Sequence, residues 1–255
     1  MLRGLNIAAT GMLAEMNKQD LIANNLANVE TNGFKRDVLA FESFPMALVY
    51  AYESGSSGKS YQDTSPAPIG YLGTGVGVTE AMIDYSQGAF RRTENELDFA
   101  LMGDGFFAVQ TPDGERYTRN GNFMLDAQGQ LVNSDGYPVL GQNGTIQISG
   151  TKVSVDESGN ISVDGQTIDS FKLVVFSQSD ALEKVGHNLF AAGAAGAPAT
   201  DVEVAQGCLE ASNVNVVKEM VEMIATLRAY EANQRVIRSQ DEMLGKAVNE
   251  VGKLA

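Results

Sequence analysis

The sequence predicts an α+β protein: a discontinuous coiled-coil helical domain formed by the N- and C-terminal helices, with a central antiparallel all-β domain. Three observations predict it. Both chain ends place apolar residues at alternating steps of four and three, the spacing of a helix that packs along a seam. The middle shows short apolar stretches between glycine-rich turns, which is typical of antiparallel hairpins. The charge divides in the same way, because residues 38–211 carry the whole net charge of −14.

The N-terminal helix is expected to end near Asn28, before the turn signal Thr31-Asn32-Gly33. We expect this segment to be retained, because Asn6 and Thr10 interrupt the apolar stretch that a secretory signal needs. The seam consists of Leu5, Ala9, Met12, Met16, Gln19, Ala23 and Leu26.

The C-terminal helix has the longer seam, which is sustained over about five heptads. Val217, Val221 and Ile224 widen its first half, which predicts a contact with more than one neighbour. The seam consists of Val216, Met220, Met223, Leu227, Tyr230, Gln234, Ile237, Asp241, Leu244, Val248 and Val251.

The middle of the chain is rich in turns. Residues 70–165 hold 16 of the 27 glycines, and turns such as Asn120-Gly121 and Asn143-Gly144 separate apolar stretches such as FKLVVF (171–176). Residues 53–70 are rich in Ser, Gly and Pro, as loops and linkers are. We therefore expect a helical axial domain of residues 1–36 and 209–255, a linker or extended loop region of 37–69, and a β domain of 70–208.

Composition excludes several classes of protein. The pI of about 4.4 argues against a nucleic-acid binder, which needs a basic face. No apolar run approaches the roughly 20 residues that span a bilayer, so we expect no membrane insertion. A single cysteine, Cys208, leaves no internal disulfide, and a single histidine, His187, leaves no His-rich metal site.

The candidate chemical motifs are incomplete. ESGSSGKS (53–60) lacks the first glycine of a P-loop, because Glu53 stands in that place. Asp156 begins a calcium-loop pattern, but the sixth position is Ile161 and the twelfth is Thr167. The other carboxylates fall in turns without the apolar flanks that would raise a pKa. We therefore expect no enzyme, no catalytic, cofactor-binding or metal-binding residue, no cofactor and no small-molecule substrate.

Three segments together resemble the flagellar rod and hook family of axial proteins. They are NNLANVETNGFKR (24–36), the stretch from Leu97 to Gly141, and LEASNVNVVKEMVEMIATLRAYEANQRVI (209–237). Residues that match the family motifs include Asn25, Asn28, Thr31, Gly33, Phe34, Gly103, Gly105, Phe106, Phe107, Tyr117, Thr118, Arg119, Gly121, Phe123, Ser212, Asn213, Val214, Asn215, Met223, Arg228, Tyr230 and Asn233.

The resemblance implies a structural subunit of the bacterial flagellar basal-body rod. Such a subunit polymerises through its terminal helices into the tubular drive shaft that transmits torque from motor to hook. The implied partners are copies of itself, other rod and hook axial proteins, and the flagellar type III export apparatus, which carries the chain outside the cytoplasmic membrane to the basal body. The residues expected at subunit interfaces are Leu5, Met12, Met16, Leu26, Asn28, Thr31, Gly33, Phe34, Val216, Met220, Met223, Leu227, Tyr230, Ile237 and Leu244.

Chain length fits the two mid-sized rod members of the family. FESFPMALVYAYESG (41–55) and the ending QDEMLGKAVNEVG (240–252) favour the proximal-rod member, with the distal-rod or hook-type member as the alternative. An alternative from another class is a secreted glycan-binding or hydrolytic β domain with helical oligomerisation ends. A third reading is a closed coiled-coil oligomer, such as an adhesin stalk. Dependence of particle size on concentration distinguishes an open polymer from a closed oligomer.

Overall fold

The structure, a computed structural model, describes residues 2–51, 67–150, 152–176, 182–186, 188–193, 196–199 and 202–251. The expected ESGSSGKS loop and His187 lie outside the described residues. The chain forms two compact units: unit 1 is Met1–Leu26, Asp37–Ile83 and Val216–Ala255, and unit 2 is Ala27–Arg36 and Asp84–Asn215. Unit 1 contains the helices and unit 2 contains antiparallel sheets, so the α+β prediction is confirmed.

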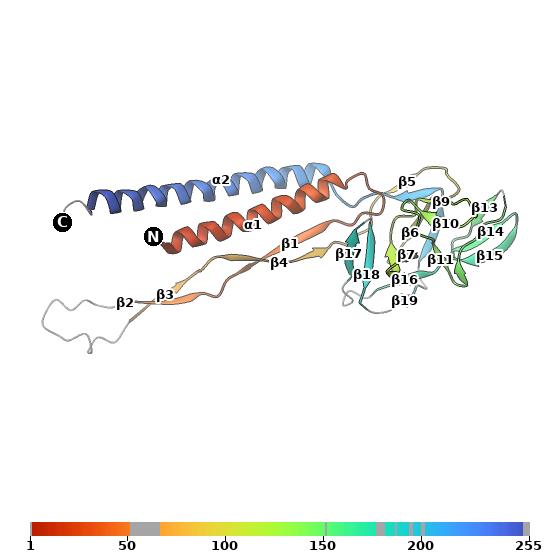
Figure 1. The fold of residues 1–255 in the computed structure, drawn as a ribbon, viewed down its shortest axis with the longest axis horizontal. Coiled ribbons are helices and arrows are strands. Elements are labelled where there is room, and N and C mark those ends of the chain that lie inside the picture. Colours follow the sequence, from red (N-terminus) through yellow and green to blue (C-terminus); the bar gives the residue numbers. More distant parts are fainter. Residues whose placement is uncertain are drawn as a thin grey trace. The chain divides into compact units, whose positions relative to one another are not determined.

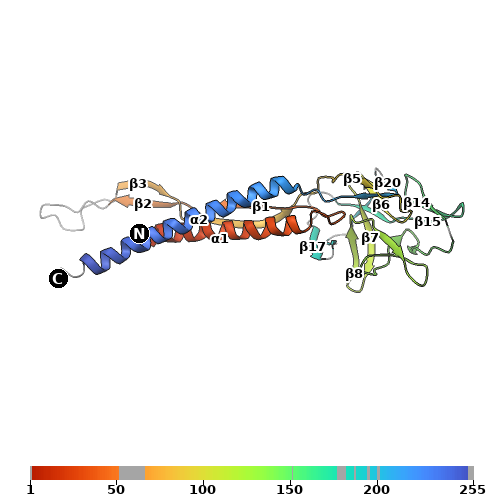
Figure 2. The same cartoon turned by 90° about the horizontal axis from the view of Figure 1, so that it is seen from above.

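Unit 1 is built on two helices, α1 (Leu2–Ala27) and α2 (Val216–Lys246), and α2 continues as a π-helical turn at Ala247–Val251. The helices lie side by side and run in opposite directions (Figures 1 and 2). In the described part of the chain, neither helix has the length and hydropathy needed to cross a membrane.

The less exposed face of α2 differs from the predicted seam. It consists of Glu219, Met223, Thr226, Tyr230, Asn233, Ile237, Gln240 and Leu244, which follow alternating steps of four and three. Half of these residues are polar. The predicted residues Val216, Met220 and Leu227 are instead exposed in this single chain. The apolar residues of α2 and its least exposed residues therefore follow two different, partly overlapping stripes.

Two antiparallel ribbons complete unit 1. One pairs β1 (Asp37–Ser43) with β4 (Val76–Ile83), and the other pairs β2 (Ala47–Ala51) with β3 (Ala67–Leu72). Strands thus occupy all but residues 44–46 of the described part of the region expected as a linker or extended loop. The side-chain amide of Asn25 holds the first residue of β1 in place. It donates a hydrogen bond to Asp37 O (2.9 Å) and accepts one from Asp37 N (3.0 Å).

Unit 2 consists of antiparallel strands. The largest sheet has the order β17 (Leu182–Gly186), β18 (Leu189–Ala192), β8 (Gly114–Thr118), β7 (Phe106–Thr111), β16 (Leu173–Val175) and β19 (Ala197–Pro198). A second sheet contains β13 (Val153–Val155), β14 (Asn160–Val163) and β15 (Gln166–Ser170). Four strand pairs complete the unit: β5 (Phe90–Arg92) with β21 (Cys208–Glu210), β6 (Phe99–Met102) with β20 (Glu203–Gln206), β9 (Phe123–Leu125) with β10 (Leu131–Asn133), and β11 (Leu140–Gly141) with β12 (Gly144–Thr145).

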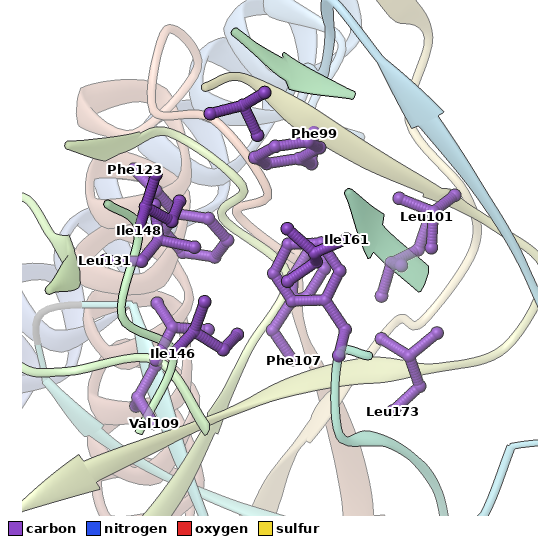
Figure 3. Close-up of a cluster of buried hydrophobic side chains, with 14 of the residues drawn as sticks. Phe99, Leu101, Phe107, Val109, Phe123, Leu131, Ile146, Ile148, Ile161 and Leu173 are labelled. Atoms are coloured by element: carbon purple, nitrogen blue, oxygen red, sulfur yellow. The ribbon is translucent and has the colours of Figure 1, made fainter. Parts of the chain in front are cut away.

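Aromatic rings occupy the centre of unit 2 (Figure 3). The ring of Phe107 lies 5.2 Å from that of Phe123 and 5.3 Å from that of Phe171, both edge-on, and Phe99 lies 5.1 Å from Phe171. Edge-to-face packing at these distances adds to the stabilisation from apolar burial. These rings form part of the hydrophobic core in the described part of unit 2.

We predict that Phe107→Ala lowers the free energy of unfolding by about 3–5 kcal/mol, because it leaves a cavity among rings that are already in contact. Urea denaturation followed by near-ultraviolet circular dichroism measures this change. The control is Phe90→Ala on β5, where the side chain is 41% exposed. Equal losses in the two variants would contradict the assignment of Phe107 to the core.

Candidate functional site

Three charged side chains from distant parts of the chain meet inside unit 2. Lys35 Nζ lies 2.6 Å from Glu210 Oε1, and Arg119 Nη1 lies 3.6 Å from Glu210 Oε2. The exposed fractions of the side chains are 1% for Lys35 and Glu210 and 2% for Arg119. We call this group the ionic cluster. It brings residues 35, 119 and 210 to one buried position.

Backbone groups supply further partners to the ionic cluster. Glu210 Oε1 also accepts a hydrogen bond from Gly88 N (2.9 Å), and Lys35 Nζ donates to Ser86 O (3.0 Å). Arg119 donates to Leu101 O (3.2 Å) and to Gly103 O. Two cations face one carboxylate, so the carbonyl dipoles stabilise the positive charge that Glu210 does not neutralise.

Burial disfavours the charged forms of both cations. It lowers the pKa of Lys35 below its ordinary value, although the neighbouring Glu210 carboxylate opposes the shift. Burial also lowers the pKa of Arg119, again against the attraction of Glu210. Because burial disfavours both positive charges, Lys35 and Arg119 depend on their contacts with Glu210 and the backbone carbonyls. Through Lys35, these contacts hold segment 27–36 against the β strands of unit 2.

Gly33 places segment 27–36 directly against the backbone of Arg119. Its φ of +68° lies in the left-handed region, where a side chain is strained. A Cβ there would lie 2.5 Å from the carbonyl carbon of Arg119 and 2.6 Å from Asn120 N. Gly33 N also donates to Glu210 O (2.7 Å). Only glycine satisfies both the φ angle and the close approach.

Asn213 joins segment 27–36 to the strand connection at residues 84–86. Its Oδ1 accepts from Arg36 N (2.7 Å), and its Nδ2 donates to Asp84 O (2.8 Å) and Ser86 O (3.1 Å). Burial alone would raise the pKa of Asp84, but hydrogen bonds from Ser86 and the charge of Arg36 bring that pKa below its ordinary value. Asn213 is thus a further polar link between the first and third sequence motifs, beside the pair of Lys35 with Glu210.

The structure places the expected interface residues in three environments. Gly33 and Phe34 are buried in unit 2, where Lys184 Nζ lies 4.3 Å from the centre of the Phe34 ring. Exposed positions are Met16, Val216, Met220 and Leu227. Half-buried positions are Leu5, Met12, Leu26, Asn28, Thr31, Met223, Tyr230, Ile237 and Leu244.

Sequence reasoning missed Lys35 and Glu210 as site residues, and it named Arg119 only as a motif match. Charged residues are rarely fully buried, so nothing in the local pattern separates these three from surface charges. Among the described residues, no group of His, Cys, Asp or Glu side chains is arranged to hold a metal ion. The ionic cluster joins three distant segments of the chain, so it has a structural role in unit 2.

Comparison with known proteins gives the family. Residues 5–35 match the family described as flagella basal body rod protein, residues 100–163 match the D1 domain of flagellar hook protein FlgE/F/G, and residues 205–250 match the C-terminal part of flagellar basal body rod FlgEFG protein. Each segment supplies one residue of the ionic cluster. The three matches therefore meet in space as well as following one another in sequence.

Relatives that match over nearly their full length indicate the same family. The chain is 38% identical to the flagellar basal-body rod protein FlgG of Buchnera aphidicola subsp. Schizaphis graminum, over 96% of this chain and 98% of the relative. It is 37% identical to FlgG of Bacillus subtilis (98% and 99%) and 31% identical to the flagellar hook-basal body complex protein FlhO of the same species (100% of both). The chain belongs to the flagellar basal-body rod and hook family, and it is a structural rod subunit of the flagellar basal body.

We predict that Gly33→Ala destabilises unit 2 by at least about 1–2 kcal/mol, the cost of a left-handed backbone, with the contact at Arg119 adding to it. The control is Gly73→Ala, because a Cβ at Gly73 meets nothing within 4 Å. Thermal unfolding monitored by circular dichroism compares the two. A Gly33→Ala protein as stable as Gly73→Ala would refute the close packing of this segment.

We predict that Glu210→Gln costs about 3–5 kcal/mol, because it leaves two buried cations without a carboxylate. Lys35→Met should cost less, since Arg119 then still faces Glu210. Urea denaturation measures both. Lys172→Met is the control, because its pair with Glu115 (2.8 Å) is partly exposed and such pairs contribute about 0–1 kcal/mol. The opposite order, with Lys35→Met the costlier change, would contradict the charge balance described above.

Proposed function

We propose that the chain polymerises through its terminal helices into the tubular shaft that transmits torque from motor to hook. One observation carries this proposal: the first half of α2 presents an exposed apolar stripe. Val217 is 72% exposed, Val221 is 61% exposed and Ile224 is 52% exposed, and Met220 and Leu227 adjoin them. A contiguous apolar patch on a soluble subunit marks an interaction surface.

The stripe is suited to a repeating contact between unlike surfaces. Spacings of three and four residues place its side chains along one side of a helix, so a neighbouring helix can cover them together. Contacts that join unlike surfaces of identical subunits give an open helical filament when they do not close into a ring. A tube of stacked subunits is such a filament.

The expected interface residues divide by exposure. We propose that Met16, Val216, Met220 and Leu227 contact neighbouring subunits directly. Leu5, Met12, Leu26, Met223, Tyr230, Ile237 and Leu244 would support the coiled-coil arrangement of the two helices. Asn28, Thr31, Gly33 and Phe34 would act by shaping segment 27–36: Thr31 Oγ1 lies 3.2 Å from Asn28 Oδ1, and Phe34 N donates to Thr31 O (3.3 Å).

The expected domains are also part of the proposal, although the compact units divide the chain differently: residues 27–36 lie in unit 2 and residues 37–83 in unit 1. Residues 1–36 and 209–255 would form the axial domain and 70–208 the outer β domain, with 37–69 as the connection between them. Family membership implies assembly with other flagellar axial proteins. We also propose passage through the flagellar type III export apparatus, which a chain with a single cysteine can enter without a disulfide to obstruct it.

The position along the rod is part of the proposal. The sequence around residues 41–55 favours the proximal-rod member. Two of the three relatives reported above carry the name FlgG, which belongs to the distal-rod member. Identity over nearly the full chain weighs more than one short segment, so we propose the distal position.

We further propose that the chain has no catalytic activity. A hollow of about 680 Å³ in the described part of unit 2 is lined by residues that include the acidic side chains Asp156, Glu157 and Glu203. Hydrogen bonds from Asn160 lower the pKa of Asp156, whereas a general acid of a glycosidase needs a raised pKa. The Asp156 carboxylate instead accepts from Asn160 N (2.8 Å) and orders its own turn.

We predict that Leu227→Asp blocks incorporation into the rod while unit 2 stays folded. Covering this position buries apolar surface worth about 1.5–3 kcal/mol, and a carboxylate there would lose its hydration without gaining a partner. The measurements are motility and immunoblotting of purified basal bodies. Ser239→Asp is the matched control, because it adds the same charge at an exposed polar position of α2. Normal incorporation of Leu227→Asp would remove the main support for assembly through α2.

A further inference from the structure

The contacts between α1 and α2 pair polar side chains with glycines. A Cβ at Gly4 would lie 2.5 Å from Gln240 Nε2, and a Cβ at Gly11 would lie 3.0 Å from Asn233 Nδ2. The side chains of Gln240 and Asn233 therefore rest on positions of α1 that carry no side chain. Gly4 and Gly11 are seven residues apart, and so are Asn233 and Gln240, so the two contacts repeat after one heptad of each antiparallel helix.

The polar positions of α2 continue at the same interval. Thr226 and Glu219 precede Asn233 by seven and fourteen residues, and both are buried. The Oγ1 atom of Thr226 and the Oε1 atom of Gln240 are buried without a hydrogen-bond partner within the described part of the chain. Buried polar atoms without a hydrogen-bond partner reduce stability. The polar residues that recur at every seventh position of α2 therefore need an explanation other than stability.

A polar residue in a heptad seam can specify alignment at a cost in stability. Apolar seams tolerate a shift by one heptad, because one apolar side chain replaces another. Here a shift in one direction would place Asn233 against Lys18 instead of Gly11. A shift in the other direction would take Gln240 away from Gly4. Each shift loses a fit between a polar side chain and a glycine.

We propose that Asn233 and Gln240, resting on Gly11 and Gly4, form a register lock that sets the alignment of α1 with α2. The register lock rests on the proposed function, in which neighbouring subunits cover the apolar stripe of Val217, Val221 and Ile224. The alignment of the two helices determines which part of α1 lies beside this stripe. Subunits with one alignment present identical surfaces to their neighbours, as a repeating filament requires.

Cysteine crosslinking tests the register lock in the full-length chain. In a Cys208→Ser background, Ala8→Cys is combined in turn with Ile237→Cys, Leu244→Cys or Tyr230→Cys. Ile237 lies on the less exposed face of α2 between the two polar contacts, one residue from the position level with Ala8 in the observed alignment. The other two positions are one heptad away on either side. Basal bodies are purified and oxidised, and crosslinks within one chain are identified by mass spectrometry of monomeric bands.

We expect the Ala8–Ile237 pair to crosslink about tenfold more than either shifted pair, which corresponds to about 1.4 kcal/mol between alignments. Asn233→Leu with Gln240→Leu should bring the three yields to within about twofold of one another. Arg235→Leu with Glu242→Leu, which adds the same side chains at exposed positions of α2, should leave the tenfold preference intact.

Equal yields from the three pairs in the starting background would overturn the register lock, and so would an unchanged preference in the Asn233→Leu, Gln240→Leu variant. Recovery of the chain in basal bodies reports on the proposed function separately. If the chain is not recovered there, the same oxidation of the purified full-length chain measures the alignment by itself.

Discussion

The buried carboxylate of Glu210 is the constraint on which the architecture depends. A carboxylate excluded from water needs cations and donors, and Lys35, Arg119 and the Gly88 amide supply them. These partners come from the start, the middle and the end of the chain. Unit 2 therefore completes its fold only when the segment after α1 has reached the β strands, which makes the β unit and the chain ends interdependent.

Asn25 and Asn213 likewise join segments that are distant in the sequence, at the connections between strands. Asn213 orders Arg36 and Asp84 in unit 2, and Asn25 orders Asp37 in unit 1. Residues 36 and 37 are the last of segment 27–36 and the first of the β1–β4 ribbon. Two side-chain amides thus hold consecutive residues where the chain passes from one unit to the other. Amides serve well here because each can donate and accept at once.

The sequence predicted what depends on local pattern. Helical spacing identified α1 and α2, and glycine turns identified the hairpins of unit 2. The β1–β4 and β2–β3 ribbons were not foreseen, because their strands adjoin a Ser, Gly and Pro-rich stretch that resembles a linker. The ionic cluster was missed for a different reason: the burial of Lys35 and Glu210 depends on contacts between distant segments. The seam of α2 was read from its apolar residues, several of which face outward, so the polar residues Thr226 and Asn233 were not assigned to the less exposed face.

The two units obtain their stability in different ways. Unit 2 has a dense aromatic core around Phe107 and forms its own interior. In unit 1 the less exposed face of α2 carries Thr226, Asn233 and Gln240, while Val217 and Val221 face solvent. Hydrophobic burial is the main source of stability. In the proposed assembly, neighbouring chains would bury the apolar side of α2, so assembly would stabilise unit 1 by mass action.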